Sequence, residues 1–201
     1  MTTKNNTYPV TLRGELTMPP SRWVWLFKWL LAIPHCIVLF FLYFGSFFVG
    51  VFSFFSVLFA GKIPRGAFDY MVGVMRWSWR VNFYGLQVLG TDKYPPFSLD
   101  EDPSYPADLY VQYPDHLANG MVLVKWLLGI PHWIIIFAFQ GGQNWIGAVP
   151  LLSLVCAVIN LFTGKYPEDL FKVIIGMDRW TYRAQAYILL RDEYPPFKLE
   201  E

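Results

Sequence analysis

The segment KWLLAIPH at residues 28–35 returns almost unchanged as KWLLGIPH at residues 125–132. Sliding the chain on itself by 97 positions aligns these two segments. The same shift aligns Tyr8-Pro9 with Tyr105-Pro106 without a gap, so the similarity begins well before the apolar segment. The chain therefore uses one apolar, helix-forming unit twice.

Three further motifs recur in the same order. At an offset of 103, Gly61-Lys62-Ile63-Pro64 matches Gly164-Lys165-Tyr166-Pro167, and Arg76-Trp77 with Arg80 matches Arg179-Trp180 with Arg183. At an offset of 100, Tyr94-Pro95-Pro96-Phe97 matches Tyr194-Pro195-Pro196-Phe197. Anchors in one order predict two tandem repeats, at residues 1–97 and 105–201, joined by an acidic linker at 98–104.

The composition indicates a membrane protein. Of the residues, 55% are hydrophobic, 19% are aromatic and 15% are charged, so the chain is more apolar than a typical soluble domain. A net charge of +1 argues against a nucleic-acid-binding protein, which would be expected to present a basic face. Cys36 and Cys156 lie inside apolar runs and suggest neither a disulfide framework nor a zinc site.

The apolar runs predict four transmembrane helices in two hairpins. Residues 23–60 contain one charged side chain, that of Lys28, and this run is close to twice the ~20 residues that one crossing needs. We expect spans at about 23–43 and 46–60 in the first repeat. In the second repeat we expect spans at about 121–139 and 145–162, on either side of a polar, uncharged tip at 140–144.

An amphipathic helix is predicted after each hairpin, at about 65–89 and 168–190. Arg65, Asp69, Arg76 and Arg80 share one face, and Glu168, Lys172, Arg179 and Arg183 occupy the same four places. Two arginines inside a crossing would cost roughly 2.5 to 3.5 kcal/mol each, so we expect both helices to lie in the cytoplasmic interface. If they crossed instead, each repeat would have three spans and the repeats would be inverted.

The charges also predict the orientation. All 16 Lys and Arg lie on the side of the termini and linker, so the positive-inside bias places both termini in the cytoplasm. Residues 8–17 and their copy at 108–114 predict short extended or β arms that could pair on the water side. The expected fold class is an all-α membrane protein, multi-pass in a bacterial inner membrane.

These motifs resemble a bacterial membrane family catalogued as domain of unknown function 4389. The resemblance rests on the IPH segment, the Gly-Lys-x-Pro step, the Arg-Trp segment and the Tyr-Pro-Pro-Phe ending, and both repeats carry all four. It implies a multi-pass bacterial membrane protein and supplies no activity or catalytic residues. Ile63 stands where Tyr166 retains the aromatic residue usual before the proline.

The sharpest candidate site is a stripe of polar residues within the apolar runs. Lys28 and His35 share one helical face, and Lys125 and His132 repeat the stripe. One interpretation is structural: each histidine satisfies backbone or a neighbouring helix, and each lysine reaches the cytoplasmic surface. In a second interpretation the two histidines line a polar cavity between the repeats, and in a third they ligate a haem there.

The basic residues of the amphipathic helices are a second candidate site. Arg76, Arg80, Arg179 and Arg183 could bind anionic lipid headgroups, each drawn to a negative leaflet by roughly 1 kcal/mol. Alternatively, the charged residues of this face form ion pairs with one another, as Arg65 and Asp69 would at positions i and i+4 of a helix.

Together these features favour a non-enzymatic accessory or scaffold protein that contacts anionic lipid and a partner membrane complex, with no nucleic acid, metal or cofactor. The first alternative is a small transporter or lipid-handling protein with a polar cavity at the repeat interface. The second is a bis-histidine b-type haem protein.

Overall fold

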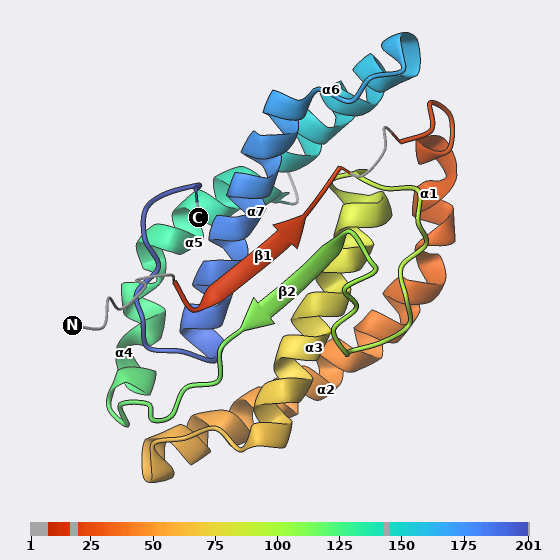
Figure 1. Cartoon of the computed structure of the whole chain (residues 1–201). Helices are drawn as coiled ribbons and strands as arrows, with labels where there is room; N and C mark the ends of the chain where they lie inside the picture. Colours follow the sequence, from red (N-terminus) through yellow and green to blue (C-terminus); the bar gives the residue numbers. More distant parts are fainter. Residues whose placement is uncertain (1–7, 17–19, 143–144, 201) are drawn as a thin grey trace, which may run out of the picture.

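Seven α-helices and two short antiparallel sheets make up the computed structural model, which describes residues 8–16, 20–142 and 145–200 (Figure 1). The first repeat contributes β1 (Val10–Gly14), α1 (Trp25–Leu31), α2 (Ile33–Ala60), α3 (Arg65–Val81) and one π-helical turn, η1 (Asn82–Leu86). The second contributes β2 (Ala107–Val111), α4 (Met121–Leu128), α5 (Ile130–Gln140), β3 (Gly141–Gly142), β4 (Trp145–Ile146), α6 (Ala148–Thr163) and α7 (Glu168–Leu189). The protein is thus mostly helical and built from two tandem copies.

The first layer is the sheet of β1 and β2, which takes one strand from each repeat. The strands pair antiparallel, with Leu12 opposite Leu109 at the centre of the register and Val10 opposite Val111 at one end. Leu109 is the equivalent of Leu12 at the offset of 97. The pseudo-twofold axis that relates the repeats therefore passes between these two leucines.

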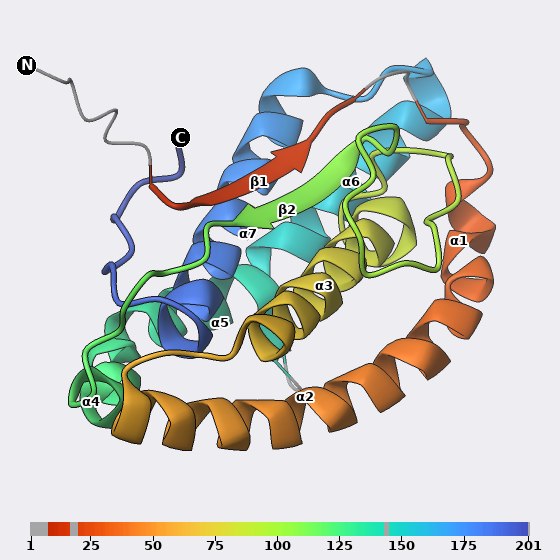
Figure 2. The same ribbon diagram turned by 60° about the horizontal axis from the view of Figure 1, so that its bottom comes forward.

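The second layer consists of α3 and α7, which lie between the sheet and the remaining helices (Figure 2). Both helices are buried along most of their length. Trp79 and Tyr182, which are equivalent residues, meet edge to face with ring centroids 5.6 Å apart, so the pseudo-twofold axis also passes between α3 and α7. The sequence predicts a position for these helices on the membrane surface, whereas here they form the core under the sheet.

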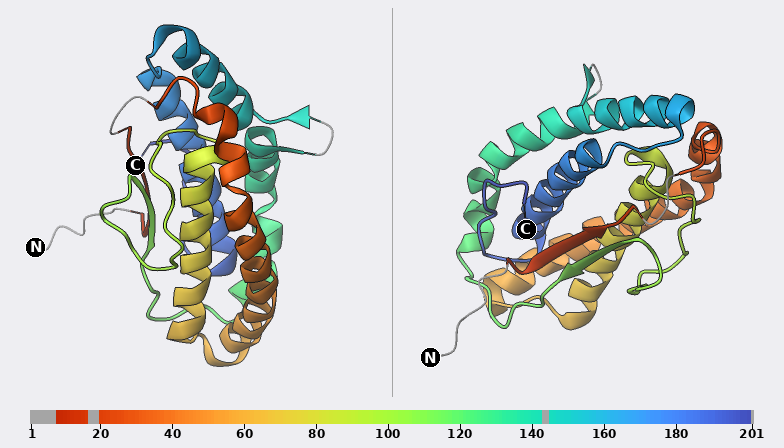
Figure 3. Two further views of the ribbon diagram at one scale, coloured as in Figure 1. Left: turned by 90° about the vertical axis from the view of Figure 1, so that its right-hand side faces the viewer. Right: turned by 45° about the horizontal axis from the view of Figure 1, so that its top comes forward.

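The third layer consists of α1 and α2 from one repeat and α4, α5 and α6 from the other (Figure 3, left). By length and composition α2 could cross a membrane, and α4 with α5 passes the same test as a pair bent by 47°. Most of the exposed large apolar side chains of the described residues belong to this layer. Its outward surface is therefore apolar, and the sheet lies on the opposite side of the molecule.

The Gly-Lys-x-Pro step of each repeat turns the chain from the third layer back into the second. Gly61 and Gly164 end α2 and α6 in the left-handed conformation, at φ 64° and 70°, which glycine adopts without a steric penalty. The Pro64 and Pro167 residues then adopt extended backbone and precede the first residue of α3 and α7. The motif is thus a helix end followed directly by a helix start.

In the first repeat, the predicted turn at residues 43–46 is wrong, because α2 runs unbroken for 28 residues from Ile33 to Ala60. Gly45 lies inside the helix. A Cβ there would lie 2.6 Å from the Tyr70 hydroxyl, which donates a hydrogen bond to the carbonyl of Leu42. This glycine therefore permits a close approach by α3, and the first repeat has no helical hairpin at this point.

The second repeat does break where its tip was expected. Gly141, at φ 86°, ends α5, and the short β3–β4 hairpin projects away from the sheet before α6 begins (Figure 3). The offset between the repeats rises from 97 to 103 across this region. The hairpin therefore accounts for the six extra residues, inserted into what is one continuous helix in the first repeat.

Candidate functional site

Each repeat buries its lysine against an aspartate that precedes the Tyr-Pro-Pro-Phe segment. Lys28 is 0% exposed; its Nζ lies 2.7 Å from Asp92 Oδ1 and donates to the Thr91 carbonyl over 2.8 Å. In the second repeat, Lys125 Nζ lies 2.6 Å from Asp192 Oδ1. Although burial raises the pKa of Asp92, hydrogen bonds from Lys28 and Ser21 hold it below its usual value. The lysines therefore do not extend to the cytoplasmic surface.

Each histidine is enclosed by the aromatic residues of its own repeat. Trp77 donates its indole Nε1–H to Nδ1 of His35 over 3.0 Å, and the imidazole stacks on Phe97 with centroids 3.9 Å apart. The same contacts recur around His132, where Trp180 donates over 3.0 Å and Phe197 stacks at 4.6 Å. Because Nδ1 accepts a hydrogen bond, a neutral imidazole carries its proton on Nε2.

The tyrosine of each Tyr-Pro-Pro-Phe segment bonds to a backbone carbonyl beside the IPH segment of the same repeat. The Tyr94 hydroxyl donates to the carbonyl of Leu31, the last residue of α1, over 3.1 Å. Tyr194 donates to Leu128, the equivalent carbonyl, over 3.2 Å. In both repeats a tyrosine, and not the histidine, therefore hydrogen-bonds to the backbone at this helix end.

The predicted site of Lys28, His35, Lys125 and His132 is therefore divided into two clusters, one in each repeat. The histidine of each cluster and the Trp and Phe that contact it are here called a clamp. His35 lies in the first turn of α2 and His132 in the first turn of α5, and the junctions α1–α2 and α4–α5 lie on opposite sides of the molecule (Figure 1). Neither histidine lines the cavity between the repeats that is described below. The described residues also contain no cluster of three His, Cys, Asp or Glu suited to a metal ion.

The predicted headgroup arginines point inward. Arg76 Nε lies 2.9 Å from Asp108 Oδ1, and Arg76 Nη1 donates to the carbonyl of Leu99 over 2.8 Å. Arg80 is 0% exposed and lies 3.2 Å from Asp108 Oδ2. These ion pairs fasten the strand β2 and the segment after Tyr-Pro-Pro-Phe to α3.

The second repeat uses its arginines in the same way. Arg179 Nη1 donates to the carbonyl of Leu199 over 3.2 Å, and Arg183 Nη1 donates to that of Glu200 over 2.9 Å. On the exposed end of α3, Arg65 pairs with Asp69 at 3.1 Å, as the internal interpretation predicts. The geometry of all four arginines thus agrees with internal pairing.

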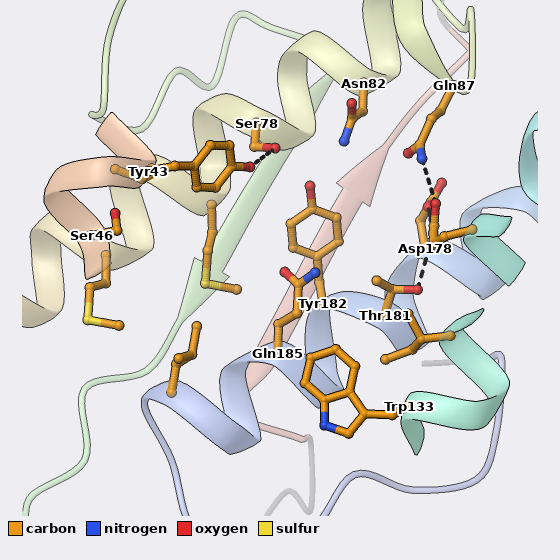
Figure 4. A pocket seen from close by; sticks show the side chains of 16 residues that line it. Tyr43, Ser46, Ser78, Asn82, Gln87, Trp133, Asp178, Thr181, Tyr182 and Gln185 are labelled. Carbon is orange, nitrogen blue, oxygen red and sulfur yellow. Dashed lines mark hydrogen bonds between the residues drawn. The ribbon is translucent and has the colours of Figure 1, made fainter. Parts of the chain in front are cut away.

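A cavity of about 460 Å³ lies between the repeats, enclosed by α2 and α3 on one side and by α5 and α7 on the other (Figure 4). This volume falls within the roughly 300 to 1,000 Å³ of small-molecule sites. Its polar lining residues are Tyr43, Ser46, Ser78, Asn82, Gln87, Gln140, Asp178, Thr181, Tyr182 and Gln185. The sequence predicted a polar cavity at the repeat interface as an alternative, but with the two histidines as its lining.

The cavity lies on the pseudo-twofold axis, because its walls contain equivalent residues from both repeats. Ser78 and Thr181 are one such pair, and Asn82 and Gln185 are another. Tyr43 donates to Ser78 over 2.5 Å, and its equivalent, Gln140, donates to Thr181 over 3.3 Å. The outer helices therefore contact the inner helices in the same way on both sides of the cavity.

One pair breaks this symmetry: Met75 of the first repeat is replaced by Asp178 in the second. Asp178 is 1% exposed, and its Oδ1 accepts a hydrogen bond from Gln140 Nε2 over 3.0 Å. Gln87 orients Gln140 by donating to its Oε1 over 2.5 Å. The Oδ2 atom has no hydrogen-bond partner among the described residues. Burial raises the pKa of Asp178 to about 7, although the bond from Gln140 opposes the shift.

None of these cavity residues is among the candidate site residues predicted from the sequence. The one available signal was the comparison of repeats, in which an acidic residue stands at position 178 where the first repeat has Met75. An isolated carboxylate on a mostly apolar helix face is costly to bury and therefore a functional candidate.

A family model described as Domain of unknown function (DUF4389) matches residues 22–98 and, a second time, residues 119–199. The two matches cover most of the chain, and each ends just past a Tyr-Pro-Pro-Phe segment. They confirm both the resemblance and the tandem duplication. No curated protein and no solved structure matches the chain.

Proposed function

The chain belongs to this family, domain of unknown function 4389. From that premise we propose that it is a non-enzymatic membrane protein whose third layer is embedded in one leaflet of the bilayer, an arrangement here called its membrane seating. The observation that carries this proposal is the order of the layers. The third layer presents apolar side chains outward, and Lys28 and Lys125, the only charged residues of its helices, are buried. The ion-paired sheet side lies opposite (Figure 3).

The packing of α3 argues for helices that lie along the membrane surface rather than across the bilayer. The α3 helix packs against α2 on one side and against β2 on the other. If α2 crossed the bilayer, α3 and the Arg76–Asp108 ion pair would be drawn toward the hydrocarbon with it. Charged groups and unpaired strand edges are costly there. We therefore place α2 and α5–α6 in the leaflet and the sheet in water, on the cytoplasmic side of a bacterial inner membrane.

Exposed cations at the ends of the third layer support contact with anionic lipid. Lys62 and Lys165 follow the last turns of α2 and α6, and Arg22 precedes α1. All three are exposed. Each cation near a negative leaflet contributes roughly 1 kcal/mol, so these residues replace the inward-facing arginines as proposed headgroup contacts.

The proposed role is that of an accessory protein that holds its water-exposed sheet side at the membrane for a partner complex. Flotation with lipid vesicles tests the seating. We expect the protein to float with phosphatidylcholine vesicles and to bind more tightly when phosphatidylglycerol is added. Replacing Lys62, Lys165 and Arg22 by glutamine should abolish most of that increase, whereas Lys93→Gln, on the sheet side, should not. Failure to float with either vesicle would overturn the proposal.

The cavity favours a second candidate function, the binding of a lipid, because its position on the repeat axis places it directly beneath the third layer. The two functions are compatible, since a protein seated in a leaflet has access to the lipids around it.

A further inference from the structure

We propose that the cavity on the pseudo-twofold axis binds an uncharged lipid with a hydroxyl-bearing head, of the monoacylglycerol type. This inference rests on the proposed membrane seating, because the ligand would enter from the leaflet. Three features favour this ligand: the unpartnered Oδ2 of Asp178, the lack of cationic side chains among the described lining residues, and the position of the opening.

The cavity opens toward the apolar side of the molecule. Tyr43 and Trp133, which come from the outer helices α2 and α5, are 50% and 44% exposed at its rim. Asp178 and Thr181 also line the cavity and are both buried, and the part of the wall that they form is here called the inner end. Figure 4 shows Trp133 on the wall opposite Tyr43. An amphiphile that entered from the bilayer would therefore place its head at Asp178 and its chain toward the rim.

Asp178 provides an unsatisfied polar atom at the inner end. Gln140, which accepts a hydrogen bond from Gln87, donates to Oδ1 of Asp178, and Oδ2 stays buried and without a partner among the described residues. Burying a polar atom without a partner carries a free-energy penalty. The Ser46 hydroxyl, elsewhere in the lining, is likewise buried without a partner in the described part of the chain. A ligand that hydrogen-bonds to both atoms would remove both penalties.

The lining excludes a phosphate or carboxylate head. Of the described residues that form the cavity, none is Lys, Arg or His, so nothing would neutralise an anion. Asp178, in its charged form, would repel one. Phospholipids of the bilayer are therefore rejected at the inner end, even though they surround the rim.

A hydroxyl head fits both protonation states of Asp178. A hydroxyl can donate to the carboxylate and can accept from the protonated acid, whereas an ammonium matches only the first state and a carbonyl only the second. The side-chain amides of Asn82 and Gln185 and the hydroxyls of Ser78 and Thr181 add further donors and acceptors. This mixture suits a head with two or more hydroxyl groups.

Lipid retention in nanodiscs tests the assignment. The protein would be assembled in phosphatidylcholine nanodiscs that contain equal amounts of monooleoylglycerol, oleylamine and phosphatidylglycerol, and the lipids that remain bound after release would be counted by native mass spectrometry. We expect one monooleoylglycerol per chain. Preferential retention of oleylamine or phosphatidylglycerol, or no retained lipid, would overturn the assignment.

The matched variant is Asp178→Met, which restores the residue that the first repeat carries at Met75. It should weaken monooleoylglycerol retention on the order of tenfold, the effect of about one hydrogen bond to a charged group. Asp169→Asn, which removes a fully exposed carboxylate from the same helix, should bind as the native protein does. Equal retention by Asp178→Met and the native protein would contradict the proposal.

Flotation separates this inference from the membrane seating. Asp178→Met should float with vesicles as well as the native protein does, because the third layer is unchanged. Should this variant fail to fold, the competition among the three lipids on the native protein still decides the ligand class.

Discussion

Trp77 donates its indole Nε1–H to Nδ1 of His35, and the equivalent Trp180 does the same for His132, both over 3.0 Å. This bond joins the IPH segment of each repeat to the Arg-Trp segment of the same repeat. The repeated motifs are therefore partners in a clamp that holds the outer helix to the inner one, which explains why they occur together.

Trp77→Phe should lower the free energy of unfolding by about 1 to 3 kcal/mol, because the buried Nδ1 of His35 would lose its donor. Trp180→Phe should have an effect of the same size. Thermal unfolding in nanodiscs measures both. The control is Trp29→Phe, since Trp29 is exposed and donates only to the Leu26 carbonyl within its own turn. Equal melting temperatures for Trp77→Phe and the control would refute the clamp.

Lys28→Met should destabilise the fold by about 3 kcal/mol, the lower end for a broken buried pair, because Asp92 is 33% exposed and keeps some solvation. The double variant Lys28→Met with Asp92→Leu should recover part of this loss, because no buried charge is left alone. Lys172→Met is the control, since that ammonium is exposed at 3.8 Å from Asp169. If Lys28→Met were as stable as the control, the pair would have no structural role.

The stability of the protein should depend on pH through Asp178. Its pKa rises from 3.8 in the unfolded chain to about 7 in the fold, so the folded state holds the proton more tightly. Protonated Asp178 therefore contributes on the order of a few kcal/mol to the free energy of unfolding. This contribution is fully present below about pH 4 and is lost as the pH rises through about 7. Chemical denaturation should show this decline relative to Asp178→Met. Parallel pH profiles for the two proteins would contradict it.

Local chemistry made part of this architecture predictable. The repeats and the paired arms follow from matched motifs. The ends of α2 and α6 follow from the Gly-Lys-x-Pro motif, in which Gly61 and Gly164 each come shortly before a proline. The helix ends depend on residues close together in the sequence, and the repeats and their arms depend on motifs that recur at a regular offset, so the sequence pattern carries the information.

The remaining features depend on contacts between distant segments. Gly45 resembles a turn signal, and only the Tyr70 hydroxyl packed against it explains why α2 continues. Arg76 and Arg80 looked like lipid ligands because their partner Asp108 lies on a strand of the other repeat. The residues that line the cavity could not be predicted for the same reason, since they come from four helices that lie far apart in the sequence.

Cysteine accessibility tests most directly whether the third layer lies in one leaflet. Phe44, 62% exposed and midway along α2, would be replaced by cysteine after Cys36 and Cys156 are changed to serine. In intact spheroplasts and in inside-out vesicles, we expect no reaction of Phe44→Cys with a membrane-impermeant maleimide, and full reaction after detergent is added. Lys62→Cys should react in inside-out vesicles only. Labelling of Phe44→Cys in intact spheroplasts would place this segment at the outer surface and contradict the account.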